Sequence, residues 1–215
     1  IVLMTLVVWL LRKYAGVDSQ TGNALYYING RDGATTDVYG DAEVALQGES
    51  ALPKYTGGLT LHFDYKNFFL DGTFYYSGGN KVYEDWATYT NNTGNRSYTY
   101  NYGTVLLDRW QQPGDVTNTP KLISSSSTSE QISTRFLHDG DFIRLRDVAF
   151  GYKFTPDMLK GTGLDGVTLS IRGTNLWTWV KDDNLKYDPE VRADGFTNIA
   201  NPPIKQVSFS ANIKF

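Results

Sequence analysis

The sequence predicts an all-β fold, an antiparallel up-and-down β-barrel segment that crosses a membrane with its strands. Five segments alternate apolar and polar residues with a period of two, as strands with two different faces do. Long and short links between these segments follow one another in strict alternation. Aromatic residues make up 14 % of the 215 residues, beside 21 Gly, and this composition favours strands over long helices.

Composition argues against several classes of protein. The net charge is −3 and no basic patch stands out, which argues against a nucleic-acid partner. Cysteine is absent, so the sequence has no disulfide framework and no thiolate metal site. Mean hydropathy is −0.37, which argues against a helical membrane protein but not against a barrel, whose lumen and loops are polar.

The first two alternating segments are residues 59–65 and 68–77. Leu59, Leu61 and Phe63 share one face of the first, and polar residues take the other. Only Lys66 and Asn67 separate the two segments, so we expect a tight hairpin.

The third segment, FIRLRDVAFGYKF, changes phase within its length. Ile143 and Leu145 share one face, but Val148 and Phe150 are the apolar residues afterwards. One extra residue near Arg146–Asp147, a β-bulge, explains this change. In the fourth segment, VTLSIRGTNLWTW, Val167, Leu169 and Ile171 oppose Thr168, Ser170 and Arg172, and the segment ends in Trp177 and Trp179.

The fifth segment, QVSFSANIKF, contains about ten alternating residues, which is enough for a tilted strand to cross a bilayer. We predict that its apolar set faces lipid: Val207, Phe209, Ala211 and Ile213. The intervening Ser208, Ser210 and Asn212 would face the aqueous lumen.

The links predict the orientation of the strands. Residues 16–54, 79–140 and 181–204 are long links, and residues 66–67 and 155–166 are shorter ones. If the strands form an up-and-down meander, every long link lies at one end of the strands and every short link at the other. Outer-membrane barrels are built in this way, with long extracellular loops and short periplasmic turns. A soluble β-sandwich also alternates with a period of two, and it stays open as an alternative.

Residues 1–11 do not fit the pattern, because they are apolar on both faces except for Thr5. They are too few for a membrane-spanning helix, which needs about 20 residues. They carry neither an initiator Met nor a charged leader, so we expect the chain to be a piece of a longer protein.

The C-terminal third carries a family resemblance. FLHDGDFIRLRDVAFGYKF, LSIRGTNLWTW, LKYDPEV and the Pro-rich approach ANPPIKQVSFSANIKF resemble the end of SusC/RagA-type TonB-dependent outer-membrane transporters of Bacteroidetes. RKYAGVDSQTGNALYYING and PKYTGGLTLHFDYKNFFLDGTFYYSGG are similar to preceding segments of that family. The resemblance covers roughly residues 12–78 and 135–215; residues 79–134 carry no signature.

The resemblance implies a 22-stranded barrel of which residues 1–215 hold about the last six strands, with the plug domain and TonB box outside this chain. It implies import of glycans or peptides across the bacterial outer membrane, energised by TonB. It also implies a SusD-like surface lipoprotein as partner. A terminal Phe215 is similar to the signal that the barrel assembly machinery recognises. Two alternatives to such a transporter stay open. One is a soluble carbohydrate-binding β-sandwich, and the other is a passive porin or adhesin barrel.

No pattern of an active site is present, so we expect no enzyme, no cofactor and no metal. The two histidines, His62 and His138, lie far apart, and Asp139-Gly-Asp141 is typical of a turn.

Aromatic residues of the long link are the candidates for substrate or partner contact: Tyr83, Trp86, Tyr89, Tyr98 and Trp110. Packing of these rings on one another is the alternative. Arginines on the strands are predicted to face the lumen: Arg144, Arg146 and Arg172.

Overall fold

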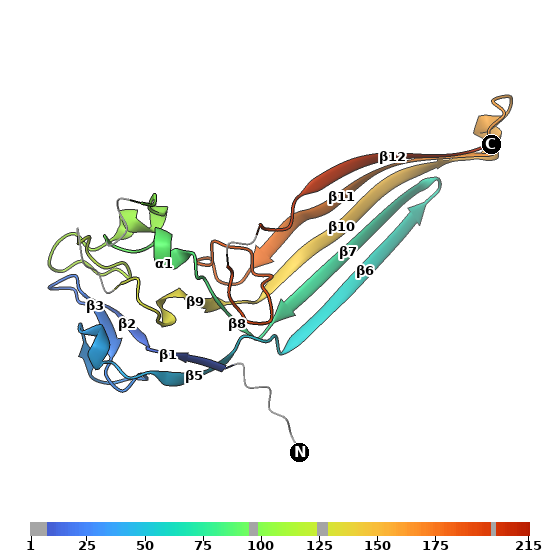
Figure 1. The fold of residues 1–215 in the computed structure, drawn as a ribbon. Coiled ribbons are helices and arrows are strands. Elements are labelled where there is room, and N and C mark those ends of the chain that lie inside the picture. The colour runs from blue at the N-terminus through green and yellow to red at the C-terminus, as the bar shows by residue number, and fades with distance from the viewer. Residues whose placement is uncertain (1–7, 95–98, 124–128, 199–200) are drawn as a thin grey trace, which may run out of the picture. The chain divides into compact units, whose positions relative to one another are not determined.

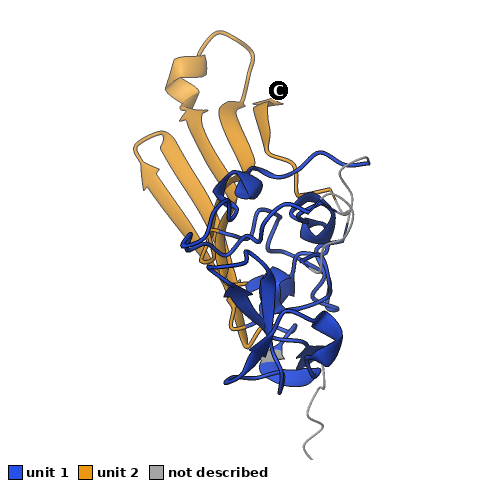
Figure 2. Ribbon diagram, turned by 90° about the vertical axis from the view of Figure 1, so that its left-hand side faces the viewer, with its two compact units in different colours: residues 1–52, 80–139, 184–200 blue, residues 53–79, 140–183, 201–215 orange. Residues whose placement is uncertain are grey.

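The computed structural model describes residues 8–94, 99–123, 129–198 and 201–215. The chain divides into two compact units (Figure 2). Unit 1 comprises residues 1–52, 80–139 and 184–200, and unit 2 comprises residues 53–79, 140–183 and 201–215. Among the described residues, no helix is both long and apolar enough to span a membrane.

Unit 2 is one five-stranded antiparallel sheet with the order β12-β11-β10-β7-β6 (Figure 1). Each strand pairs with the next member of unit 2 along the chain, so the topology is up-and-down. The five alternating segments of the sequence are its five strands: β6 (Tyr55–Tyr65), β7 (Phe68–Gly78), β10 (Phe142–Phe154), β11 (Gly166–Val180) and β12 (Gln206–Lys214). The total number of strands in the barrel stays a prediction.

The hairpin between β6 and β7 is confirmed. Tyr65 pairs with Phe68, so only Lys66 and Asn67 lie outside the ladder. Lys66 has a φ of 54°, the left-handed conformation that tight hairpin turns need.

The predicted β-bulge is also confirmed. The register of β10 shifts between Leu145 and Asp147 against both of its neighbours. Against β7, Arg146 is the extra residue. Against β11, Asn175 and Leu176 together stand opposite Arg146, so that strand is irregular there as well. Leu145 pairs with Phe74, and Phe150 pairs with Leu70. The bulge therefore keeps the apolar residues of β10 on one face although their parity in the sequence changes.

The register joins the strands into two continuous faces. One row of cross-strand partners runs Phe63, Leu70, Phe150, Ile171 and Phe209 across all five strands. The adjacent row, on the opposite face, runs His62, Asp71, Ala149, Arg172 and Ser208. The sheet thus has one apolar face and one largely polar face.

The links of unit 2 follow the predicted alternation. The Lys66–Asn67 turn and the link that carries η4 (Pro156–Leu159) lie at one end of the sheet, as the antiparallel register requires. The links from β7 to β10 and from β11 to β12 leave from the other end. They contribute residues 80–139 and 184–200 to unit 1.

The described residues of unit 1 form three small sheets. In the first, β1 (Val8–Leu11) pairs with β5 (Ala45–Ser50). The second joins β2 (Tyr14–Val17), β3 (Ala24–Tyr27) and β4 (Thr35–Thr36), and the third joins β8 (Lys81–Tyr83) to β9 (Leu137–Asp139). One helical turn, α1 (Ala87–Thr90), and the 3₁₀ turns η1 (Tyr39–Asp41), η2 (Thr104–Asp108) and η3 (Thr134–Phe136) complete it.

These strands correct the description of residues 16–54 and 79–140 as mere links. Each strand there has two to six residues, which is too short to give a clear alternating pattern. The unusual N-terminal segment is also accounted for from residue 8 onward. Trp9 and Leu11 are buried and Leu10 is exposed, so β1 contributes to the core of unit 1.

The core of unit 1 has two aromatic-rich clusters. Trp9, Tyr83 and Phe136 dominate one, and Tyr26 with Tyr14 and Tyr39 forms the other. Burial raises the pKa of Tyr14 to about 12 and also raises the pKa values of Tyr26 and Tyr83. A buried tyrosinate has lost its hydration, so the neutral phenol is the form that the fold favours.

Unit 1 should therefore lose stability in alkali. The unfolded chain ionises Tyr14 from about pH 10, whereas the folded chain holds its proton to about pH 12. The stabilising contribution is complete below pH 10 and declines as the pH rises through this interval. An absorbance titration of tyrosinate should show a cooperative late phase, and a Tyr14→Phe variant should reduce it. Ordinary titration of every tyrosine near pH 10 would contradict this prediction.

Candidate functional site

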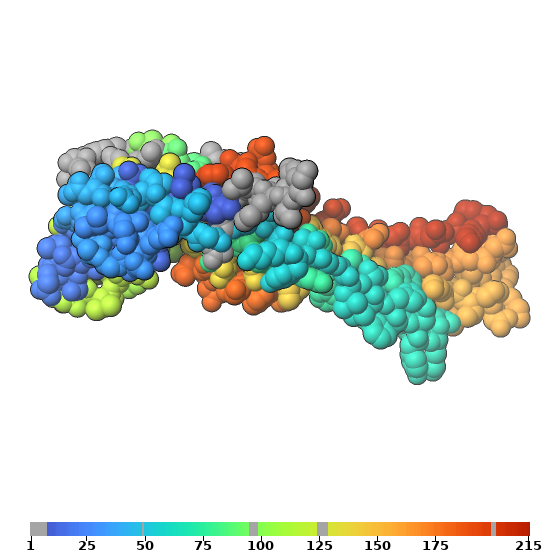
Figure 3. Space-filling view, turned by 90° about the horizontal axis from the view of Figure 1, so that it is seen from below, coloured from blue at the N-terminus to red at the C-terminus, as the bar shows by residue number. Residues whose placement is uncertain are grey.

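The apolar face of unit 2 is exposed in this chain. Phe63, Phe150 and Phe209 expose 60 %, 48 % and 83 % of their surface. Unit 2 has no second sheet to cover them, and Figure 3 shows its strand side chains at the molecular surface. A soluble protein seldom leaves so large a continuous apolar face in water, because burying such surface is worth about 25 cal/mol per Å². The face needs an apolar environment, and the β-sandwich alternative lacks its required second sheet in unit 2.

Aromatic residues lie towards both ends of the apolar face. Phe68 and Tyr152 pair near the turn end, and Tyr76 and Trp179 both pair with Ile143 near the other end. Eight residues separate Phe68 from Tyr76, which corresponds to roughly 26 Å along the strand and about 20 Å across a bilayer at a tilt near 40°. Two aromatic belts at such a spacing are typical of strands that cross a membrane.

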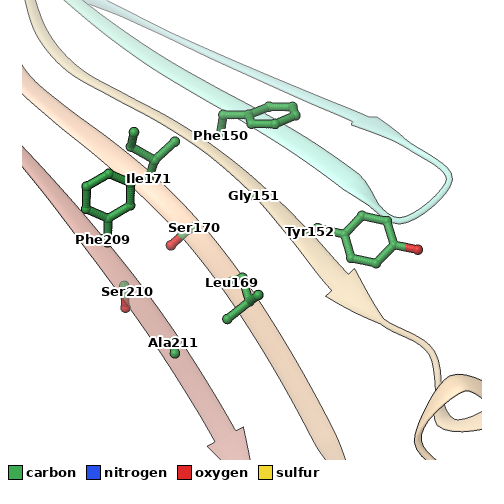
Figure 4. A pocket seen from close by; sticks show the side chains of 9 residues that line it. All are labelled: Phe150, Gly151, Tyr152, Leu169, Ser170, Ile171, Phe209, Ser210 and Ala211. Carbon is green, nitrogen blue, oxygen red and sulfur yellow. The ribbon is translucent and has the colours of Figure 1, made fainter.

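The predicted lipid-facing residues of β12 share this face. Val207, Phe209, Ala211 and Ile213 pair with Gly173, Ile171, Leu169 and Val167 of β11. Around Ala211, whose side chain is only a methyl group, the face has a shallow depression of about 480 Å³ between Phe209, Leu169 and Tyr152 (Figure 4). Its lining is almost entirely apolar, which suits a hydrocarbon chain. Contact with lipid stays a prediction.

The opposite face carries charged side chains in pairs. His62 lies between Asp64 and Asp71, with one ring nitrogen on each carboxylate. The Nε of Arg172 lies 2.7 Å and 2.9 Å from the two carboxylate oxygens of Asp147. These contacts give both ring nitrogens of His62 a hydrogen-bond partner, as expected for a polar residue of this face. The described residues bring together no group of three side chains that would hold a metal.

The three predicted lumen arginines differ in their surroundings. Arg172 is on the polar face, and its side chain is 62 % exposed. Arg144 occupies the same face but is 1 % exposed, and its Nε donates to Thr178 Oγ1 at 3.1 Å. Arg146, at the bulge, places its guanidinium 4.9 Å from the centre of the Tyr75 ring. A solvent-exposed role fits Arg172 best, and the lumen assignment of all three stays a prediction.

The candidate contact aromatics mostly pack within unit 1. Tyr83 is 1 % exposed, with its ring 5.8 Å from that of Trp9 and 5.4 Å from that of Phe196. Tyr83 thus belongs to the core of unit 1, and its ligand contact stays a prediction. Trp86 stacks on Tyr89 with ring centres 5.0 Å apart, and Tyr100 packs edge-on against both. Tyr98 lies outside the described residues.

Trp110 also has a packing role. Its Nε1 donates to Ser19 O at 2.9 Å, and a Cβ on Gly22 would lie 2.4 Å from its ring. Because Gly22 has a φ of +72° as well, only glycine suits that position beside the indole. Ligand contacts by Trp86, Tyr89 and Trp110 stay predictions, but their mutual packing is what the structure shows.

Two residues near the end of the long link 79–140, Asp141 and Arg135, make hydrogen bonds to distant parts of the chain. Asp141 accepts hydrogen bonds from Gly79 N at 2.7 Å and from the Tyr55 hydroxyl at 2.9 Å. Asp139 ends β9 and Asp141 directly precedes β10, so a short link between two strands stands where a turn was predicted. Arg135, which sequence reasoning missed, donates to Ser129 O at 2.7 Å and to Asn91 O at 3.1 Å. Burial lowers the pKa of Arg135. An arginine in a polar stretch carries no signal that would have revealed this buried role.

Known proteins with similar sequences are TonB-dependent receptors. TonB-dependent receptor P26 of Formosa agariphila is 31 % identical over 187 residues, which is 84 % of this chain and 17 % of the relative. TonB-dependent receptor P39 of the same organism is 26 % identical over 77 % of the chain and 16 % of its own length. The chain thus spans about a sixth of these relatives. No family model matches it.

Solved structures of a peptide importer have the same fold. The RagAB peptide importer in its open-open state matches 97 % of this chain and 22 % of its own, with a TM-score of 0.81 and 27 % identity. The closed-closed state matches 95 % of this chain with a TM-score of 0.74 and 27 % identity.

The sheet, its two faces and these matches define a class of protein: the chain is part of the β-barrel of a TonB-dependent receptor. Within that class it is SusC/RagA-like, as its C-terminal motifs indicate. The relatives are receptors and transporters, so the comparisons give no support to an enzyme.

Proposed function

We propose that the protein to which these strands belong is an outer-membrane active transporter that imports peptides or glycans and is energised by TonB. The observation that supports this most is the match of the two-faced sheet and its loops to the RagAB peptide importer over 97 % of the chain. A SusD-like surface lipoprotein is the proposed partner at the extracellular side. In this arrangement the apolar face contacts outer-membrane lipid and the polar face lines the lumen.

Peptides are the better supported of the two substrate classes. The similar solved structures are of a peptide importer. Glycan binding commonly uses exposed aromatic rings, whereas Trp86, Tyr89 and Tyr100 pack on one another here. A glycan importer is the second candidate.

Uptake in cells tests this proposal. Deletion of the gene should abolish uptake of a fluorescent oligopeptide, and collapse of the proton gradient should do the same in cells that keep the gene. A passive porin would continue to admit the probe after the gradient has collapsed. A soluble binding protein would be found in the aqueous fraction without detergent. Uptake of oligosaccharides alone would select the glycan alternative.

A further inference from the structure

We propose that a depression in unit 1 binds the C-terminal end of a peptide, with the carboxylate on Arg109 and the last aliphatic side chain in the apolar part. This inference rests on the proposed function and narrows its substrate class. The depression has a volume of about 330 Å³, near the lower limit for ligand pockets. Its lining residues are Tyr102, Gly103, Thr104, Leu106, Leu107, Arg109 and Leu122.

Backbone contacts hold this depression in shape. Gly103 N donates to Thr90 O at 2.8 Å, which fixes the start of η2 to the end of α1. At the other side, Arg109 forms an isolated bridge with Thr119, and Trp110 N donates to Thr119 O at 2.9 Å. The segment that carries Leu122 is therefore held against η2, and the pocket is a built feature of unit 1.

The apolar part of the depression is accessible. Leu106 is buried, with 6 % of its surface exposed, whereas Leu107 and Leu122 expose 76 % and 50 %. Two exposed leucines beside a buried one leave apolar surface that an aliphatic side chain would cover. No carboxylate is among the lining residues, so an anionic ligand meets no repulsion from the wall.

Arg109 supplies the charge. Its Nη1 donates to Leu106 O at 3.1 Å, which holds the guanidinium at the wall of the depression. No acidic side chain of the described residues pairs with it. A guanidinium has five N–H donors in a planar fork, and this fork matches the two oxygens of a carboxylate. The remaining donors of Arg109 are therefore suited to an anionic ligand that approaches over the leucines.

Tyr102 adds a second polar group. Its hydroxyl is buried and has no hydrogen-bond partner in the part of the chain that the structure describes. A buried hydroxyl without a partner is unfavourable, so a ligand oxygen that accepts its hydrogen bond would be preferred. A carboxylate bound in the depression would therefore have both a guanidinium and a hydroxyl among its lining residues as donors.

A peptide C-terminus matches this combination. It carries a carboxylate and a side chain on one carbon atom, so both reach neighbouring parts of one small pocket. A neutral oligosaccharide has neither a carboxylate nor an aliphatic side chain, and a peptide N-terminus has the same charge as Arg109. The geometry thus favours oligopeptides that end in an aliphatic residue with a free carboxylate.

Binding to the full-length transporter, purified with its partner in detergent, tests the inference. The probes are two fluorescent peptides of one sequence ending in leucine, one with a free carboxylate and one with a C-terminal amide. The carboxylate form should bind roughly tenfold more tightly, as loss of a charge-assisted hydrogen bond implies. Arg109→Gln should abolish this difference, whereas Arg31→Gln, at an exposed turn of unit 1, should preserve it.

Other outcomes separate the inference from the proposed function. Equal binding of both peptides to the unmodified protein would overturn the inference and leave peptide import standing. Failure of every peptide to bind, with binding of an oligosaccharide, would overturn the inference and select the glycan alternative of the proposed function. Should Arg109→Gln fail to fold, the comparison of the two peptides on the unmodified protein still decides. A probe ending in glycine should bind more weakly than the leucine probe, and equal affinity would refute the role of Leu107 and Leu122.

Discussion

Replacement of Phe209 by arginine should destabilise the folded barrel by about 2–4 kcal/mol, the cost of a cationic side chain on the lipid face near the bilayer midplane. Phe209 is 83 % exposed and pairs with Ile171 in the middle of the apolar face, between the two aromatic belts. An arginine there must either lose hydration or bend towards a distant interface. Equilibrium unfolding of the full-length protein in lipid vesicles would measure this loss.

The matched control is Ser210→Arg on the same strand. Ser210 pairs with Ser170 on the polar face, where a long cation can stay hydrated. It is a better control than Ser208→Arg, because Ser208 pairs with Arg172 and would place two cations together. We expect a change of less than about 1 kcal/mol for Ser210→Arg, as for a substitution in the lumen. Equal losses for Phe209→Arg and Ser210→Arg would refute the assignment of the two faces.

Tyr83→Ala should destabilise unit 1 by about 3–5 kcal/mol, the usual cost of removing a large ring from a core. Tyr83 is 1 % exposed and contacts Trp9, Phe136 and Phe196. Proteolysis of residues 80–139 under native conditions would report the loss, because local opening precedes unfolding of the strands.

Tyr83→Phe separates packing from a polar role. The variant keeps the ring and removes only the hydroxyl, which lies by the backbone of Ser133. Proteolysis should therefore be nearly as slow as in the unmodified protein. Rapid proteolysis of Tyr83→Phe would show that the hydroxyl, rather than the ring, stabilises the loops.

The strands of unit 2 were predictable because their pattern is long and repetitive. A sheet between lipid and water must alternate along every strand, so seven or more residues reveal both its existence and its faces. The change of phase around Arg146 even located the bulge, because a one-residue insertion is the simplest way to keep Val148 on the same face as Leu145.

The loops were much less predictable, for two physical reasons. Strands such as β1 and β8 are too short for a period to appear, and they pair with β5 and β9, which are distant in sequence. A tyrosine among polar residues also looks the same whether it is buried, as Tyr83 is, or exposed. The depression beside Arg109 requires residues 119–122 to return to η2, and no local pattern indicates that return.

The central claim is that unit 2 separates lipid from water, and single nitroxide labels test it most directly. Labels on a cysteine-free background of the full-length protein in vesicles would scan β12 and β10, residue by residue. Labels at Val207, Phe209, Ala211 and Ile213 should be accessible to oxygen dissolved in lipid. Labels at Ser208, Ser210 and Asn212 should be accessible to a water-soluble relaxation agent.

On β10 the lipid signal should appear at Ile143 and Leu145 and then, after one extra residue at Arg146, at Val148 and Phe150. This change of phase is what a barrel wall with the bulge requires. A scan in which both sets of labels are equally accessible to the water-soluble agent, or in which the period continues through Arg146 without a shift, would contradict the account.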